Sequence, residues 1–405
     1  MPDAVLVAAA RSPIGRAFKG SLAAMRPDDL AVQMLQAALA QVPALEPRDI
    51  DDLVLGCAQP GGEAGFNMSR VVAVLAGMDH LPGTTVNRFC ASSLQAVRMA
   101  FHAIKAGEGD VFVAAGVEAV SRYVKGNADS HPDTDNPSFG AARARTERLA
   151  DGHRTWVDPR SNGELPDIYL AMGQTAENVA ELEGVSRAEQ DAFAVRSQNR
   201  AEKARADGFW ERDITPVRLP DGTVVSRDDG PRAGVTLDAV AALKPAFRPN
   251  GTVTAGNACP LNDGAAALIV MSDRKAADLG LTPLARIVST AVSGISPEVM
   301  GLGPVEASQR ALARAGMSVT DLDLVEMNEA FAAQVIPSAR RLGIDEERLN
   351  VHGGAIAVGH PFGMTGARIA TTLVHGLQER DGQFGLETMC VGGGQGMAMV
   401  LERLS

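Results

Sequence analysis

Cys90 is the residue whose type and position most directly suggest chemistry. It lies in the segment NRFCASSLQA, residues 87–96, where an apolar run changes to a helical pattern. The first turn of a helix offers free backbone N–H groups and positive potential, which lower the pKa of a thiol and bind an oxyanion. Cys90 is therefore a candidate nucleophile, although an isolated cysteine is more commonly a buried structural residue.

His360 is the candidate base for this thiol. It is followed by Pro361 and Gly363 in a glycine-rich loop, and a helical pattern begins soon afterwards. An imidazole held at such a turn could deprotonate Cys90, or it could simply cap the following helix. His352 lies in the same irregular loop without the spacing of a metal site, and we interpret it as structural.

Two more segments carry reactive or polar groups. Cys390 opens the segment CVGGGQG, residues 390–396, whose glycines would let the backbone approach a ligand closely. No Lys-Ser or Lys-Thr follows, so a phosphate-binding P-loop is not favoured, and Cys390 could act as a second acid or base. Asn328 is expected at a strand end, where its amide could hold a water or a carbonyl oxygen, or could cap a helix.

Composition argues against several classes of protein. The chain of 405 residues is 45% hydrophobic and 21% charged, which is typical of a globular protein with roughly two or three folding units. The net charge of -11 argues against a general nucleic-acid binder, whereas local arginines could still bind a small anionic substrate. The four cysteines form no C-x-x-C pair, which argues against a zinc ribbon and predicts free thiols in the cytoplasm. No apolar run is long enough to cross a membrane, and the N-terminal run lacks the basic residues of a signal peptide.

Hydrophobic periodicity predicts the elements that position these residues. In residues 1–120 short apolar runs alternate with helical patterns, which is typical of βαβ units and a mostly parallel sheet. Residues 121–250 are rich in glycine, proline and aspartate around one helical stretch at 175–208, and we interpret them as an insertion. From residue 252 the first pattern returns. The expected strands are 3–10, 53–56, 84–89, 111–115, 265–271, 285–291, 324–327 and 397–402, and the expected helices include 28–41, one that ends at Gly107, 308–315 and 366–379.

Taken together, the segments around Cys90, Asn328, His360 and Cys390 resemble the thiolases. The matching runs are NRFCASSLQA, NEAF, GGAIAVGHPFGMTGAR and CVGGGQG, with further matches in TAENVAE, VTAGNACPLNDGAAA and RAGVTLDAVAALKPAF. The resemblance covers essentially the whole chain. It implies an α/β fold with two similar five-stranded βαβ-type halves, stacked in α-β-α-β-α layers, and an inserted loop domain. The implied domains are residues 1–120 with about 250–273, then 121–249, then 274–405.

The resemblance also implies roles for the matching residues. Cys90 would carry the acyl group as a thioester, His360 would activate it, and Cys390 would move the proton on the α-carbon. Asn328, with His360 and a water, would form one oxyanion site, and the backbone N–H groups of Cys90 and Gly392 would form the other. Arg232 would meet the nucleotide end of coenzyme A, or else it is a solvated loop charge. The set implied to bind coenzyme A or substrate is Met172, Arg232, Phe247, Ala255, Cys259, Ala330 and Phe331.

The implied activity is that of an acyl-CoA C-acyltransferase. It would cleave 3-ketoacyl-CoA with CoA into acetyl-CoA and a shortened acyl-CoA, or run the reverse Claisen condensation. Coenzyme A would be a substrate, and neither a cofactor nor a metal is expected. The resemblance further implies a homodimer or homotetramer that acts in the cytoplasm in fatty-acid β-oxidation, without nucleic-acid or membrane partners.

Departures from the family pattern bear on the substrate. Ser93 stands where glycine is commoner, and Cys259 stands where a serine often contacts the pantetheine arm, which puts that contact in doubt. Ala171 stands where biosynthetic members often have histidine, and this favours a broader or longer acyl chain over an acetoacetyl-CoA-specific biosynthetic enzyme. A β-ketoacyl synthase would carry histidine in place of Cys390. A non-catalytic acyl-CoA- or lipid-binding module would be expected to lack one of the reactive residues, and none is missing.

Overall fold

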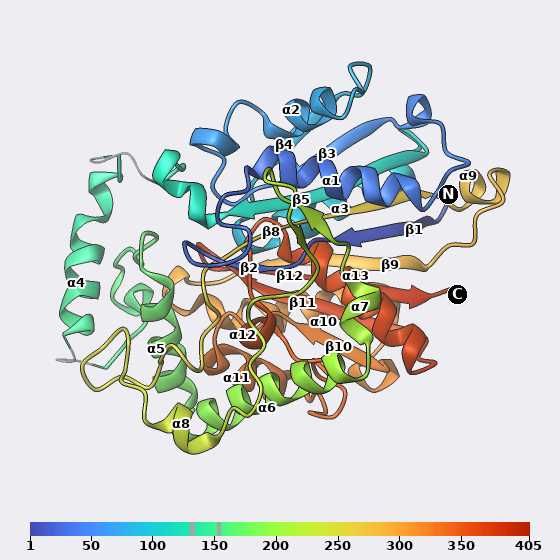
Figure 1. Ribbon diagram of the computed structural model, residues 1–405. Helices are drawn as coiled ribbons and strands as arrows, with labels where there is room; N and C mark the ends of the chain where they lie inside the picture. Colours follow the sequence, from blue (N-terminus) through green and yellow to red (C-terminus); the bar gives the residue numbers. More distant parts are fainter. Residues whose placement is uncertain (130–133, 152–154) are drawn as a thin grey trace.

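A mixed sheet forms the centre of the molecule (Figure 1). The computed structural model describes residues 1–129, 134–151 and 155–405. The strands lie in the order β10-β11-β12-β9-β1-β8-β5-β3-β4, with the short strand β2 beside β8. Their bounds are β1 Ala4–Arg11, β2 Gly15–Arg16, β3 Asp52–Gly56, β4 Gly83–Val86, β5 Val111–Ala119, β8 Asn262–Ser272, β9 Ala285–Gly294, β10 Leu324–Met327, β11 Phe384–Val391 and β12 Gln395–Arg403.

The two ends of this sheet repeat one topology. In the first half β3 is parallel to β4 and β5, and β5, β8 and β1 follow in antiparallel order. In the second half β10 is parallel to β11, and β11, β12 and β9 are antiparallel in turn. The predicted fifth strand of the second half is reduced to one parallel bridge between Val325 and Leu349. Among the described residues, the strands of the two halves are joined by the antiparallel pairing of β1 with β9, which pairs Val5 with Arg286 and Leu6 with Ala285.

Helices pack on the sheets in three layers, as the α-β-α-β-α expectation required. The helices α1 (Pro27–Ala40) and α2 (Met68–Leu75) cover the outer face of the first half. The helices α10 (Gly303–Ala315) and α11 (Ala332–Leu342) cover the outer face of the second half. Strand β8 is buried throughout because its side chains alternate between the outer core and the middle layer.

The middle layer consists of α3 (Ser92–Ala106) and α13 (Thr365–Glu379), one from each half. These helices touch at Gly366, where an added Cβ would lie 2.4 Å from the backbone nitrogen of Leu94. Beside this contact the Ser93 hydroxyl accepts a hydrogen bond from the backbone N–H of Ala367 at 2.9 Å. The serine that replaces the commoner glycine therefore joins the two halves.

Residues between β5 and β8 form most of the helices outside these layers, and Figure 1 shows them mainly to the left of and beneath the sheet. The helices α5 and α6 pack against α11 of the second half. A short hairpin, β6 with β7, follows α7. The bounds are α4 Gly140–Ala150, α5 Met172–Glu183, α6 Arg187–Ala206, α7 Phe209–Asp213, β6 Val217–Arg218, β7 Val224–Val225 and α8 Leu237–Ala241.

The single helix expected at 175–208 is wrong, because two helices occupy this range. Gly184 ends α5 in the left-handed conformation at φ +64°, which glycine adopts without steric cost. Ser186 and Glu189 then form a capping box that starts α6.

The remaining helices are short. They are α9 Asp273–Asp278, α12 Ala355–Val358 and the 3-10 turns Pro47–Asp49, Gly62–Ala64, Phe89–Ala91, Val120–Lys125, Pro137–Phe139, Pro159–Asn162, Pro297–Leu302 and Val319–Asp321. Within the described residues, no helix combines the length and the apolar character needed to cross a membrane.

Candidate active site

Cys90 lies in a 3-10 turn between β4 and the start of α3, and its side chain is buried. The preceding residue, Phe89, has φ +42°, a strained value for a side-chain-bearing residue that is often found at functional sites. Burial raises the pKa of the Cys90 thiol to about 11, although the backbone N–H groups of Gly392 and of Cys90 itself act in the opposite direction. The expectation of a lowered thiol pKa is therefore wrong, because burial outweighs the helix start. Cys90 rests as a thiol and needs a base.

His360 is held in the loop between α12 and α13 with a defined tautomer. The Thr365 hydroxyl donates to the Pro361 carbonyl at 2.7 Å, so its oxygen can only accept from His360 Nδ1, 2.6 Å away. Nδ1 therefore carries the proton and Nε2 presents a lone pair. Burial, followed by the positive charge of Arg368, lowers the pKa of His360 to about 3. The imidazole is neutral, as a general base must be.

Asn328 contacts the basic nitrogen of this ring. Its Nδ2 lies 3.2 Å from His360 Nε2, and its backbone N–H donates to the Thr388 carbonyl at 3.0 Å. The side chain is 1% exposed, and its Oδ1 has no hydrogen-bond partner among the described residues. A buried amide with a free oxygen is unusual in a structural role and fits a site that receives a ligand.

Cys390 lies in β11 and is fully buried. Burial, followed by the negative charge that Cys90 and Cys259 would carry as thiolates, raises the pKa of Cys390 well above its ordinary value. Its partner is Gln334, a residue that sequence reasoning missed. The Gln334 Nε2 donates to the Asn328 carbonyl at 3.0 Å, and its Oε1 accepts from the Val335 N–H at 3.1 Å. In this orientation Nε2 is the amide atom that lies 3.7 Å from Cys390 Sγ.

The glycine run predicted at 390–396 forms the tight turn between β11 and β12. Gly393 and Gly394 have φ of +74° and +78°, and a Cβ at Gly394 would lie 2.2 Å from the Ile295 carbonyl oxygen. This turn aims the Gly392 N–H at Cys90 Sγ, beside the N–H of Cys90 itself. Convergent backbone N–H donors are the arrangement that binding of an oxyanion requires.

Glu118 links the loop of His360 to the first half through hydrogen bonds. This residue was not identified from the sequence either. This buried carboxylate accepts from the backbone N–H groups of Gly363 and Ala58, each at 2.8 Å, and from the Tyr123 hydroxyl at 2.9 Å. Burial raises its pKa despite these donors. Sequence reasoning overlooked Glu118 and Thr365 because neither forms a motif by itself, although Thr365 follows His360 closely in the same glycine-rich segment.

Four of the residues expected to bind coenzyme A or substrate belong to the buried cluster of Cys390 or pack against it, and a fifth, Phe247, contacts one of them. Phe331 and Ala330 belong to the same buried cluster as Cys390, and Met172 and Cys259 pack against it. The ring of Phe247 lies edge-on to Phe331, with centroids 6.1 Å apart. By contrast, Ala255 and Arg232 are exposed and lie outside this cluster. The Cys259 N–H donates to the Ala330 carbonyl at 3.0 Å.

A cavity of about 470 Å³ opens onto Cys90. Its volume is within the range of small-molecule sites. The wall contains Cys90, Gly392 and Met172, but none of the other residues expected to bind coenzyme A.

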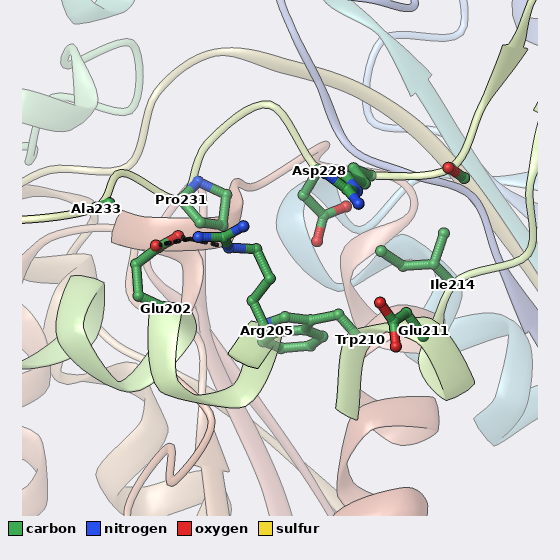
Figure 2. Close-up of a pocket in the computed structure, with 10 residues that line it drawn as sticks. Glu202, Arg205, Trp210, Glu211, Ile214, Asp228, Pro231 and Ala233 are labelled. Carbon is green, nitrogen blue, oxygen red and sulfur yellow. Dashed lines mark hydrogen bonds and ion pairs between the residues drawn. The ribbon is translucent and has the colours of Figure 1, made fainter. Parts of the chain in front are cut away.

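A second cavity, of about 300 Å³, lies between the end of α6, α7 and residues 226–233 (Figure 2). Pro231 and Ala233, the neighbours of Arg232, form part of its wall. Arg205 points toward Glu202 and forms an ion pair with it, with 2.7 Å between the charged atoms. None of the reactive residues lines this cavity. In the part of the chain that the structure describes, no group of three or more potential metal ligands is present.

Comparison with known proteins covers both halves of the chain. The thiolase N-terminal domain model matches residues 4–274, and the thiolase C-terminal domain model matches residues 281–403. The 3-ketoacyl-CoA thiolase of Bacillus subtilis (strain 168) is 44% identical over 415 residues, covering 99% of this chain and 100% of that protein. The 3-oxoadipyl-CoA/3-oxo-5,6-dehydrosuberyl-CoA thiolase of Escherichia coli (strain K12) is 45% identical over 415 residues and covers both chains completely.

Solved structures agree with this assignment. The crystal structure of the Bacillus anthracis acetyl-CoA acetyltransferase superimposes with a TM-score of 0.85 at 39% identity, covering 100% of this chain and 99% of that one. The family models, the relatives and the fold all extend over both halves that contribute reactive residues. The chain therefore belongs to the thiolase family and is an acyltransferase.

Proposed function

We propose that this thiolase cleaves 3-ketoacyl-CoA with CoA, releasing acetyl-CoA and a shortened acyl-CoA, and that Cys90 carries the acyl group between the two steps. The observation that carries the proposal is that the Cys90 thiol is protonated while His360 is neutral, with its proton on Nδ1 and its lone pair on Nε2. A thiol that cannot ionise alone becomes a nucleophile when a neutral imidazole takes its proton.

In the first step the Cys90 proton moves to His360 Nε2, and the sulfur attacks the 3-keto carbon. The oxyanion that forms accepts hydrogen bonds from the backbone N–H groups of Cys90 and Gly392. The bond between C2 and C3 then breaks, and its electron pair passes to the enolate of acetyl-CoA. Cys390 gives its proton to C2, so acetyl-CoA leaves while the acyl group remains on Cys90.

The enolate oxygen needs its own donors during this step. His360 Nε2–H, formed in the first proton transfer, and the Asn328 amide, through a water, supply them in the proposal. In the second step the CoA thiol gives its proton to the Cys390 thiolate and attacks the acyl thioester. Cys90 departs and recovers its proton from His360, which returns both thiols and the imidazole to their starting states.

Coenzyme A would enter past Arg232, with its pantetheine arm beside Phe247, Ala255, Cys259, Ala330 and Phe331. The clustering of Cys259, Ala330 and Phe331 around Cys390 supports this path. The exposed position of Arg232 suits contact with the phosphates, since a solvated arginine can rearrange toward an anion. Proton transfers among two thiols and one imidazole complete the cycle, so the proposal includes no cofactor and no metal.

We further propose that the enzyme acts in fatty-acid β-oxidation in the cytoplasm, as a homodimer or homotetramer. The free edge of β4 and the apolar side chains of Phe66 and Val124, which are 96% and 78% exposed, support association between copies. Sedimentation equilibrium of the full chain tests the assembly, and a monomer at micromolar concentration would contradict it.

A second candidate is cleavage of 3-ketoacyl-CoA whose acyl chain ends in a carboxylate. It is suggested by the substrate of the Escherichia coli 3-oxoadipyl-CoA thiolase, which is as similar to this chain as the Bacillus subtilis 3-ketoacyl-CoA thiolase. An acetoacetyl-CoA-specific biosynthetic enzyme remains the alternative within the family.

Acylation of Cys90 tests the proposal. The full chain is mixed with acetyl-CoA, quenched in acid and digested, and the peptide that contains Cys90 is weighed by mass spectrometry. One acetyl group on that peptide, absent in the variant Cys90→Ala, is the expected result. A Cys90 peptide without an acetyl group would refute the proposed role.

A further inference from the structure

The cavity that opens onto Cys90 has an apolar wall next to the thiol. Its apolar side chains are Phe89, Ile168, Leu170, Met172 and Phe362. Leu170 is buried, and Ile168 lies against the turn that carries Gly392, where its Cδ1 is 3.5 Å from the position of a Cβ on Gly393. A cavity of this composition favours hydrocarbon and offers few partners for a charged group.

The same cavity has an acidic mouth. Asp129, Thr134, Asp135 and Tyr169 line it and are exposed. The Asp135 carboxylate forms an ion pair with Arg143 at 2.6 Å, so its charge is largely compensated. Asp129 instead contacts the Gln59 side chain amide and has no ion pair with any described residue. One uncompensated negative charge therefore lies where a long acyl chain would reach solvent.

No described residue of this wall is lysine, arginine or histidine. A carboxylate moved from water into an apolar site without a cation loses its hydration and gains nothing in return. The arginines near the second cavity do not help, because that cavity shares no residue with the one at Cys90.

We infer that the acyl group carried by Cys90 is an uncharged chain, and that the apolar wall together with Asp129 rejects chains that end in a carboxylate. The inference rests on the proposed function and selects between its two substrate classes. It assigns the apolar residues to binding the hydrocarbon and Asp129 to discrimination by charge repulsion. Salt screens the repulsion between Asp129 and a substrate carboxylate, so this part of the discrimination must weaken at high ionic strength. The part that comes from the apolar wall should persist.

A matched pair of substrates tests this inference. The compounds 3-ketohexanoyl-CoA and 3-ketoadipyl-CoA have the same six-carbon chain and differ only in a terminal methyl or carboxylate. Thiolysis of each is followed by the loss of the 3-ketoacyl-CoA absorbance at saturating CoA and low ionic strength. We expect kcat/KM for the hexanoyl compound to exceed that for the adipyl compound by roughly 100-fold, as one unpaired charge in an apolar site would produce.

Two variants separate the contributions of charge and wall. Asp129→Asn should raise kcat/KM for 3-ketoadipyl-CoA several-fold and leave the value for 3-ketohexanoyl-CoA unchanged. Asp278→Asn is the matched control, because it removes one exposed carboxylate from α9 without changing the cavity, and it should alter neither value. High salt should reduce the preference in the natural chain but not in Asp129→Asn.

The outcomes are distinguishable. An equal or higher kcat/KM for 3-ketoadipyl-CoA in the natural chain would overturn the inference while leaving the thiolase activity in place. A preference for the hexanoyl compound that Asp129→Asn and salt leave unchanged would overturn the role of Asp129. Failure to cleave either compound, together with a Cys90 peptide that takes up no acyl group, would overturn the proposed function and the inference with it.

Discussion

His360 Nε2 lies 3.2 Å from Asn328 Nδ2, while His360 Nδ1 is bound to the Thr365 hydroxyl. The amide can donate to Nε2 only while the ring is neutral. Once His360 has taken the Cys90 proton, both facing groups are donors and an acceptor must come between them. Proton transfer from the thiol thus prepares a site for a negatively charged oxygen, and the protonation state of one nitrogen links the two parts of the proposed mechanism.

Thr365 should determine which nitrogen of His360 carries the proton. Thr365→Val keeps the shape of the side chain but leaves the buried Nδ1–H without an acceptor, which costs about 1–3 kcal/mol, or roughly 5- to 150-fold in kcat. Thr365→Ser retains the hydroxyl and should keep most of the activity. Nitrogen NMR of the histidine ring would check the tautomer directly, and an unchanged tautomer in the valine variant would contradict the argument.

The reactivity of Cys90 should rise with pH over most of the accessible range. Its pKa of about 11 and the pKa of about 3 for His360 mean that the resting pair is thiol and neutral imidazole between these values. Alkylation by iodoacetamide requires the thiolate, so its rate should increase about tenfold per pH unit below 11. Mass spectrometry of the Cys90 peptide measures the rate. A plateau that begins near neutral pH would indicate a resting thiolate–imidazolium pair instead.

Substitution of Cys90 and substitution of Cys390 should affect different steps of the reaction. Cys90→Ala should lose both acylation and carbon–carbon bond cleavage, because the acyl carrier is absent. Cys390→Ala should still be acetylated by acetyl-CoA on Cys90 but should fail to condense or cleave, with kcat reduced by about 10³-fold or more. Single-turnover acylation and steady-state thiolysis measure the two steps separately. Normal condensation by Cys390→Ala would exclude the acid/base role of that thiol.

Gln334 should influence the second thiol and leave the first unaffected. In Gln334→Met the side chain remains of similar size, but the donor near Cys390 is removed, so a thiolate at this buried position is less stable. We expect carbon–carbon bond cleavage to slow roughly 10-fold while acylation of Cys90 keeps its rate. Gln190→Met, at a buried glutamine of α6, is the control for a lost buried amide. An equal fall in both steps would indicate a general loss of structure.

Arg232 should affect the binding of CoA without affecting chemistry. Arg232→Ala removes an exposed guanidinium that forms no ion pair or side-chain hydrogen bond with another described residue, so the free energy of unfolding should change little. If it meets the nucleotide phosphates, KM for CoA should rise about 5- to 20-fold with kcat unchanged, and the effect should vanish with the dephosphorylated analogue. An unchanged KM would identify Arg232 as a solvated loop charge.

The reactive residues could be predicted from sequence because each lies in a short segment whose residue types indicate its local structure. The thiol at a strand-to-helix junction and the histidine in a glycine loop are both visible within about ten residues. The strands of the two halves could be predicted for the same reason, since apolar runs such as 265–271 lie between clear turn signals. The weakened fifth strand at Leu349 left no comparable signal, because a single bridge needs no run of apolar residues.

Other features depend on contacts between distant segments. The pKa of Cys90 rises because the folded chain buries the thiol, and nothing in residues 87–96 indicates that burial. Gln334 becomes relevant only because α11 brings it beside β11. The break at Gly184 is different, because glycine followed by Ser186 and Glu189 is a readable helix stop and start.

The contact at Gly366 has a consequence for evolution and engineering of the enzyme. The nucleophile precedes one helix of the middle layer and the base precedes the other, and these helices meet where a single hydrogen atom replaces a side chain. Even a methyl group at Gly366 would clash with the backbone of Leu94, so at least one of the two helices would have to shift. The close approach of the two helices that follow the nucleophile and the base therefore depends on a residue outside the cavity wall, and a search confined to that wall would never find it.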